Sequence, residues 1–225
     1  MDYRYFLADV ETTGVSTADA VCEIAWTEID TDFRVLDQGY SLINPGKPIH
    51  YAASAVNGIT DAMVADAPTI EEYMAEKGMP LFGEDVVLIA HNCQFDHRFL
   101  KPFMHDNALT LCTLKCARVL YPEAANHKQA TLAAMLGIEV ARDKAHSADG
   151  DLDVLLQLLQ HLCIDADCSL PELMHVQNIP RKISRIPFGK HKGLLLTELP
   201  KSYVSWLLKD CTNLDADLRT ALSAL

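Results

Sequence analysis

A strand-like segment near the N-terminus ends in two closely spaced acids, and this pairing limits how the chain can fold. Residues 3–10 are rich in aromatic and aliphatic side chains and are predicted to form a buried strand. Asp9 and Glu11 lie two positions apart, so they point to the same face of that strand. Two desolvated carboxylates repel each other unless a positive charge lies between them. Either a divalent cation such as Mg²⁺ or Mn²⁺ binds here, or the segment is a polar strand end that runs into a loop.

The rest of the pattern predicts an α/β layer fold with a mixed sheet. Segments 21–29 and 33–43 alternate like two further strands, and 86–90 is a continuous apolar run typical of an interior parallel strand. Helical patterns cover residues 69–77, 94–104, 114–120, 130–136 and 148–163. A three-stranded meander followed by alternating helices and strands favours helices packed against a mixed sheet.

Charge divides the chain into an acidic body and a basic tail. The formal net charge is −12; residues 1–170 carry 11 basic and 26 acidic side chains, and residues 171–225 carry 8 and 5. We therefore predict a main domain over residues 1–166, a linker near residues 165–171 and a small module over residues 171–225. An acidic body argues against binding nucleic acid by general charge, but it suits a protein whose acids bind cations.

The cysteines and the apolar segments bear on the compartment. Seven irregularly spaced cysteines argue against a secreted disulfide framework. No apolar run approaches the roughly 18 residues that a membrane span needs, and the N-terminus lacks a basic-then-apolar signal segment. We expect a cytoplasmic protein without membrane contact.

A second segment with a candidate carboxylate, Asp96, follows the apolar run 86–90. If a helix begins near Gln94, Asp96 shares a stripe with the apolar side chains at i+3, i+4 and i+7, which predicts that it faces inward. The alternative is an exposed acid in the first helical turn, where the helix dipole favours it.

A third acidic segment precedes the predicted helix 148–163. Asp151 aligns with the core-facing Val154 and Leu155, whereas Asp153 aligns with polar positions and Asp149 is intermediate. Asp151 is thus the best candidate for an inward acid. His146 lies just before the helix, where a loop could present it to a substrate, although a lone histidine is more often an ordinary surface or core residue.

Together these segments supply four carboxylates and one histidine. Such a set can hold two metal ions, one activating water and one stabilising the leaving oxygen. A histidine with a pKa of about 6.5 can take the proton from that water at neutral pH. The chemistry that fits these parts is phosphodiester hydrolysis.

The three segments resemble the exonuclease motifs of the DEDDh (DnaQ-like) 3′–5′ exonucleases, in the same order and with the same H-x-A-x-x-D register ending at Asp151. The resemblance implies an RNase H-like fold. It implies that two Mg²⁺ ions, or Mn²⁺ in their place, are bound by Asp9, Glu11, Asp96 and Asp151, and that His146 is the general base. It also implies that the terminal nucleotide is flanked by Thr12, Thr13 and Asn92, for which turn formation and capping are the alternatives.

Two positions qualify the resemblance. Many relatives have His-Gly-Ile-Thr where this chain has Asn57-Gly58-Ile59-Thr60, in a segment that helps to shape the terminal-nucleotide pocket in the family. The resemblance also makes Glu23, on the second predicted strand, a supporting carboxylate; a surface acid on an alternating strand is the alternative.

The tail combines positive charge with aromatic side chains. Its basic residues are Arg181, Lys182, Arg185, Lys190 and Lys192, and its ring-bearing residues are Phe188, His191, Tyr203 and Trp206. This composition suits capture of a DNA phosphate backbone with base stacking. Alternatively, Tyr203, Trp206 and Leu207 form the core of a small module beneath a solvated basic loop. The glycines and lysines of the tail lack the spacing of a Walker phosphate-binding loop, which argues against an ATPase. The pairs Cys112/Cys116 and Cys163/Cys168 lack the spacing of a zinc knuckle.

The resemblance implies a metal-dependent 3′–5′ exonuclease that acts on single-stranded or duplex 3′ ends of DNA and releases nucleoside 5′-monophosphates. An exonuclease that trims RNA is one alternative, because the hydrolysis does not use the 2′-hydroxyl. A proofreading subunit bound to a polymerase is another. A catalytically silent nucleic-acid-binding module is the third, but such a protein should have lost a ligand or the base, and all five positions are filled here.

Overall fold

The computed structural model describes residues 3–77, 83–139, 148–212 and 214–225. The chain divides into two compact units, an N-terminal unit of residues Met1–Gln177 and a C-terminal unit of residues Asn178–Leu225. The division follows helix α8 (Leu170–Val176), whose Leu170 and Leu173 are buried in the core of the N-terminal unit. It therefore falls after the predicted linker, because the first helix of the predicted tail packs on the N-terminal unit.

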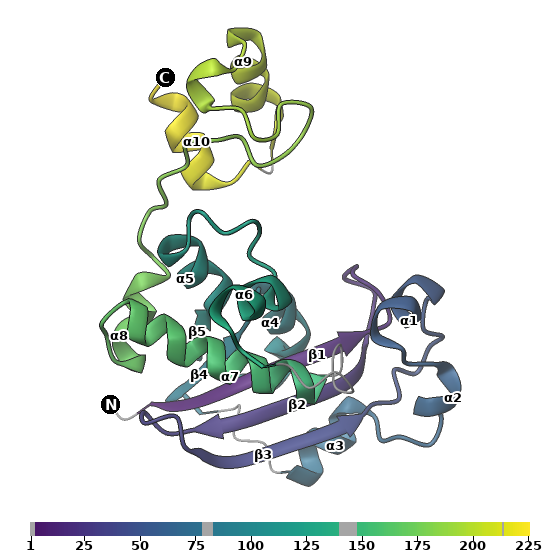
Figure 1. Ribbon diagram of the computed structural model, residues 1–225. Coiled ribbons are helices and arrows are strands. Elements are labelled where there is room, and N and C mark those ends of the chain that lie inside the picture. The colour runs from purple at the N-terminus through teal and green to yellow at the C-terminus, as the bar shows by residue number, and fades with distance from the viewer. Residues whose placement is uncertain (1–2, 78–82, 140–147, 213) are drawn as a thin grey trace. The chain divides into compact units, whose positions relative to one another are not determined.

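A mixed five-stranded sheet of order β3-β2-β1-β4-β5 forms the centre of the N-terminal unit (Figure 1). Its strands are β1 (Arg4–Thr12), β2 (Val21–Ile29), β3 (Val35–Leu42), β4 (Val86–Ala90) and β5 (Leu109–Cys112). The first three pair antiparallel, and β4 is parallel to both β1 and β5. The predicted meander, the interior parallel strand and the mixed sheet are confirmed.

Alternate residues of β1 pack on opposite faces of the sheet. Tyr5 and Leu7 belong to one core, which also contains buried residues of α5, α6, α7 and α8. The alternating residues Phe6, Ala8 and Val10 belong to a second core, which also contains buried residues of α3 and α4. The bounds of the helices on these faces are α3 Ile70–Lys77, α4 Gln94–Leu100, α5 Thr113–Leu120, α6 Gln129–Leu136 and α7 Ala148–Asp165. Asp9 and Glu11 have the parity of Tyr5 and Leu7, so β1 directs them to the face that α7 covers.

Four short elements depart from the predicted pattern. The helix predicted over 94–104 ends at Leu100 and continues as a 3₁₀ turn, η2 (Lys101–Phe103), because Pro102 cannot continue an α-helix. Helices α1 (Tyr51–Asn57) and α2 (Asp61–Val64) were not predicted; α1 buries none of its residues, so it has no apolar stripe to detect. Strand β5 has only four residues, too few for a clear alternation.

The C-terminal unit contains the 3₁₀ turn η3 (Leu196–Glu198) and helices α9 (Lys201–Asp210) and α10 (Ala216–Ser223). Its core consists of Ile186, Leu196, Leu199, Leu207, Leu214, Leu218 and Leu222. Within the described ranges, none of the helices has the length and apolar character needed to cross a bilayer.

Candidate active site

The end of β1 and the first turn of α7 bring three of the predicted acids together. One carboxylate oxygen each from Asp9, Glu11 and Asp151 lie within 4.8 Å of one another. Asp9 and Glu11 are neighbours because they are two positions apart on one strand, and Asp151 reaches them from the helix that packs on that face. The geometry therefore selects Asp151, as predicted from the helical stripe.

Asp96 joins this group from the first turn of α4. Its side chain is 3% exposed, and its Oδ1 atom accepts a hydrogen bond of 3.3 Å from the backbone N–H of Val10. Because Val10 lies between Asp9 and Glu11, this bond ties Asp96 to the acidic pair. The turn before α4 has Asn92 in the left-handed region, at φ 68°, a conformation that asparagine tolerates better than most residues. The predicted inward direction of Asp96 is confirmed.

The clustered carboxylates make one another hard to ionise. Burial and the neighbouring charges of Asp96 and Asp151 raise the pKa of Asp9 well above its usual range. Burial raises the pKa of Glu11 to about 7, although a hydrogen bond from Asn57 acts in the opposite direction. Burial likewise raises the pKa of Asp96 to about 7, against the lowering effect of its hydrogen bonds to backbone N–H groups. The site therefore has unbalanced negative charge that a bound cation would relieve.

The donor set fits a hard divalent cation. All the ligand atoms are carboxylate oxygens, which Mg²⁺ and Mn²⁺ prefer. No other group of three or more metal-ligating side chains with this geometry occurs in the part of the chain that the structure describes. All seven cysteines are free of disulfides, and among the described residues neither Cys112/Cys116 nor Cys163/Cys168 belongs to a group of three or more metal-ligating side chains.

The other predicted site residues differ from one another in their burial and contacts. His146 lies outside the described residues. Thr12 and Thr13 are buried just beyond Glu11, and their hydroxyl groups donate to Gly14 O (2.6 Å) and to Asp19 Oδ1 (3.0 Å). Both threonines thus stabilise the loop after β1. Asn92 is exposed.

Asn57 lies against Glu11 at the end of α1. Its amide donates to the carbonyl oxygen of Thr12 (3.4 Å), and its Oδ1 atom accepts from the N–H of Ile59 (3.0 Å). It also hydrogen-bonds the carboxylate of Glu11, which lowers the pKa of that group. The segment that departs from the family pattern therefore contacts one of the acids directly.

Glu23 of β2 supports the site from outside the acidic group. It is 4% exposed and lies opposite Glu11 in the β1–β2 register. Its Oε2 atom accepts a hydrogen bond of 3.0 Å from the N–H of Ala148, the first residue of α7, and its Oε1 atom accepts one of 2.7 Å from the hydroxyl of Tyr40. An unpaired N–H at a helix N-terminus favours a negative partner. Glu23 therefore fixes the helix end that carries Asp151.

Sequence reasoning missed two of these supporting contacts. Gln129 of α6 donates through its amide to the carbonyl oxygen of Asp151, and Tyr40 of β3 holds Glu23. Neither residue belongs to a motif, and each lies many positions from its partner. Only the folded arrangement could have identified them.

Glu23 is expected to act as a positioning residue. Glu23→Leu should lower kcat by about 10- to 100-fold and weaken the binding of Mg²⁺, as the loss of an outer partner of a metal ligand typically does. Glu23→Gln keeps an acceptor for Ala148 and should restore most of the activity. Steady-state kinetics and calorimetric Mg²⁺ titration would measure both effects.

The matched control is Glu28→Leu, at the other end of β2, where Glu28 pairs with Arg4 at 2.8 Å. It should cost stability without changing kcat. Equal kcat values for Glu23→Leu and the wild type would contradict the positioning role.

Comparison with protein-family models gives two matches. Residues 6–159 match the RNase_T family, described as exonucleases. Residues 177–211 match a second family, whose description refers to a quorum-sensing-regulated virulence factor.

Known proteins similar to this chain are exonucleases or parts of DNA polymerases. The chain is 26% identical to Exodeoxyribonuclease 10 of Escherichia coli over 222 residues, 96% of both chains. It is 37% identical over 158 residues to a DNA polymerase III subunit epsilon-like protein of Rhodobacter capsulatus, covering 65% of this chain but only 22% of that one. A structure of exonuclease X in complex with 5′ overhanging duplex DNA superposes with a TM-score of 0.64 at 26% identity, over 77% of this chain and 99% of the other. The predicted resemblance to the DnaQ-like exonucleases is thus confirmed, and it extends to bacterial exodeoxyribonuclease X.

Proposed function

Because the chain belongs to the RNase T/DnaQ-like exonuclease family, we propose that it is a metal-dependent 3′–5′ exodeoxyribonuclease that releases nucleoside 5′-monophosphates from DNA. The observation that carries the proposal is the meeting of Asp9, Glu11 and Asp151 within 4.8 Å, with Asp96 hydrogen-bonded beside them. Burial and the neighbouring acids raise the pKa of Asp9, Glu11 and Asp96, and bound cations would offset this unfavourable grouping of charge.

Two Mg²⁺ ions, for which Mn²⁺ can substitute, would be held by Asp9, Glu11, Asp96 and Asp151. When bound, such ions supply an activated water and stabilise the leaving oxygen of the phosphodiester. The protein contributes the fixed position of these carboxylates: β1 sets the spacing of the first two, and Glu23 and Gln129 hold the turn that carries Asp151.

We assign the general base to His146, five positions before Asp151 in the sequence. A neutral imidazole with a pKa of about 6.5 can accept the proton of the attacking water at neutral pH. Thr12, Thr13 and Asn92 are proposed to flank the terminal nucleotide. Since the threonine hydroxyls already donate within the loop, their remaining lone pairs and the backbone of the loop would make those contacts.

DNA is the proposed substrate, and the reduced cytoplasm the proposed compartment. A relative that spans 96% of this chain is named an exodeoxyribonuclease, and a solved structure holds exonuclease X in complex with 5′ overhanging duplex DNA. The seven free thiols suit a reducing environment. The R. capsulatus relative favours a second candidate, a proofreading exonuclease bound to a polymerase.

The test of substrate class compares one sequence as single-stranded DNA, as duplex DNA and as RNA, each incubated with Mg²⁺. We expect nucleoside 5′-monophosphates as the product, identified by chromatography, and faster release from DNA than from RNA. Faster release from RNA would transfer the function to RNA trimming at the same site. Co-purification with a polymerase would favour the proofreading candidate.

A further inference from the structure

The C-terminal unit leaves a tryptophan outside its own core. Leu207 of α9 has no exposed surface, whereas the adjacent Trp206 keeps 49% of its surface exposed. Tyr203, one turn earlier, packs partly against the core. The alternative in which all three side chains form the core of the module therefore holds for Leu207 and in part for Tyr203, but not for Trp206.

Trp206 is one end of a row of three rings. Its ring stacks on that of Tyr203, with centroids 5.6 Å apart and planes inclined by 25°. The ring of His191 lies 4.6 Å from Tyr203 on edge, at 65°. The loop before α9 approaches the row closely at Gly189, where φ is +71° and an added Cβ would lie 2.8 Å from the Tyr203 hydroxyl oxygen. Glycine is needed at this position because the loop packs directly against Tyr203, so the loop and the rings form one continuous surface.

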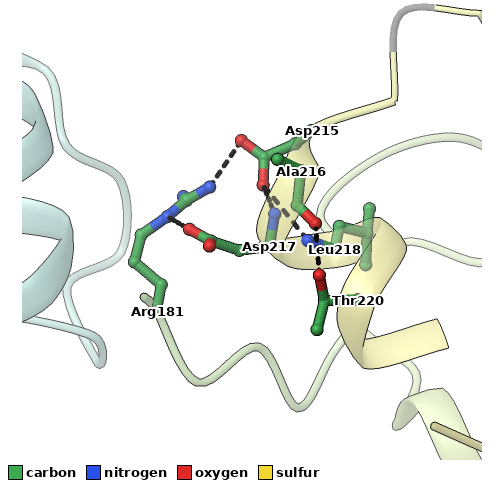
Figure 2. A network of polar contacts seen from close by, with 6 residues as sticks. All are labelled: Arg181, Asp215, Ala216, Asp217, Leu218 and Thr220. Atoms are coloured by element: carbon green, nitrogen blue, oxygen red, sulfur yellow. Dashed lines mark hydrogen bonds and ion pairs between the residues drawn. The ribbon is translucent and has the colours of Figure 1, made fainter. Parts of the chain in front are cut away.

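The two arginines of the predicted basic set stabilise the unit. Arg181 pairs with Asp215 at 2.5 Å and with Asp217 at 2.8 Å, at the N-terminus of α10 (Figure 2). Arg185 donates to the carbonyl oxygen of Gly193 at 2.8 Å. Of the five basic residues predicted to capture DNA, these two therefore already have partners within the unit.

The three lysines of the predicted set are exposed, and Lys190 and Lys192 lie on the loop that carries His191. Lys190 places its Nζ atom 5.5 Å from the centre of the Tyr203 ring, and Lys182 and Lys192 lie to either side of it in the sequence. Residues 178–225 carry eight basic and four acidic side chains, and two of those acids pair with Arg181. The unit therefore has an excess of positive charge, and Lys190 lies directly over the rings, which suits a polyanion better than an apolar protein surface.

We propose that His191, Tyr203 and Trp206, with Lys182, Lys190 and Lys192, form a second nucleic-acid contact that binds single-stranded DNA. Bases would stack on the exposed ring of Trp206 and its neighbours, while the lysines pair with the phosphates. Every base has a π face, so this contact is independent of sequence and sensitive to salt. The inference rests on the proposed DNA substrate, but it concerns a surface that takes no part in the hydrolysis.

Tryptophan fluorescence of the full chain tests the proposal. The chain has two tryptophans, and Trp26 is 4% exposed and donates to the Tyr73 hydroxyl, so only Trp206 can stack with a base. The full-length Asp9→Asn variant would be titrated with a 12-nucleotide single-stranded oligothymidylate in EDTA, which prevents degradation. We expect quenching of the emission, which is lost in Asp9→Asn/Trp206→Phe, while that double variant keeps most of the affinity measured by anisotropy.

Affinity provides the second readout. In the same background, Trp206→Ala should weaken binding about 10-fold, the range that loss of one stacked base gives. Lys190→Ala should weaken binding and reduce its salt dependence. Ile164→Ala, which removes a 71%-exposed apolar side chain from α7, and Lys77→Ala, at the end of α3, are the matched controls and should bind like the parent.

Unquenched emission at saturating DNA, or equal affinities for Trp206→Ala and Ile164→Ala, would overturn the proposal and assign the surface to a protein partner. Because the assay needs no hydrolysis, its outcome is separate from that of the proposed activity. An active enzyme without quenching refutes the surface alone, and quenching without activity refutes the exonuclease alone.

Discussion

Asp9→Asn and Asp151→Asn should each abolish hydrolysis while leaving the fold intact. Each substitution removes one of the three carboxylates whose oxygens meet within 4.8 Å. Since removal of an outer partner of a metal ligand already costs 10- to 100-fold, we expect kcat to fall by about 10³-fold or more. Single-turnover kinetics at saturating Mg²⁺ and DNA would measure the loss, because they separate chemistry from binding.

The same variants should be as stable as the wild type, or more stable, in the absence of metal. The removed charge is one that neighbouring acids repel, as the raised pKa of Asp9 indicates. Asp153→Asn is the matched control, since Asp153 is exposed on the same helix as Asp151 and should be dispensable for activity. Unchanged turnover in Asp9→Asn or Asp151→Asn would refute the assignment of the site.

The metal-free protein should lose stability as the pH rises from 6.5 to 8. Asp9, Glu11 and Asp96 have raised pKa values in the folded chain, about 7 for the latter two, whereas in the unfolded chain they titrate near 4. The folded state therefore binds more protons than the unfolded state, and its free energy of unfolding falls with rising pH. Each proton that the folded state still binds is worth about 1.4 kcal/mol per pH unit, and Glu11 and Asp96 release theirs near pH 7, so these two groups should lower the free energy of unfolding by about 1 to 2 kcal/mol across this window.

Comparison with Asp9→Asn separates this effect from that of the buried thiols Cys22, Cys93, Cys116 and Cys163, whose pKa burial raises and which also lower the stability toward pH 8. The lowered pKa values of His91 and His97 change the stability only below about pH 6.5, and those of exposed acids such as Asp19 only below about pH 4. Urea unfolding in EDTA at several pH values would measure the fall. Mg²⁺ should reverse it at pH 8, and Asp9→Asn should make it shallower. A flat profile in the wild type would show that the acids are not crowded as the structure has them.

Local signals predicted most of the sheet and the acids of the site. The apolar run 86–90 coincides with β4, and the helical stripe selected Asp151 over Asp149. These features follow from the spacing of neighbouring residues, which a sequence displays directly. Asp9 and Glu11 were predictable for the same reason.

Contacts between distant segments were not predictable. Glu23 meets Ala148 across 125 positions, and nothing in either segment indicates the other. The packing of α8 on the N-terminal unit was not predictable, because the burial of Leu170 and Leu173 depends on a surface that only the folded chain provides. In the tail, the sequence left open whether Trp206 is buried. In the structure Leu207 packs in the core of the C-terminal unit, and Trp206 keeps 49% of its surface exposed.

The central claim is that the acidic cluster performs metal-dependent hydrolysis from a 3′ end. The most direct measurement uses 5′-labelled single-stranded DNA with either a free 3′ end or an inverted, blocked 3′ nucleotide, incubated with the wild-type protein in Mg²⁺ and in EDTA. We predict a ladder that shortens from the free 3′ end in Mg²⁺, and no cleavage in EDTA or of the blocked strand. Internal cleavage of the blocked strand, a ladder that persists in EDTA, or no hydrolysis with either Mg²⁺ or Mn²⁺ would contradict the claim.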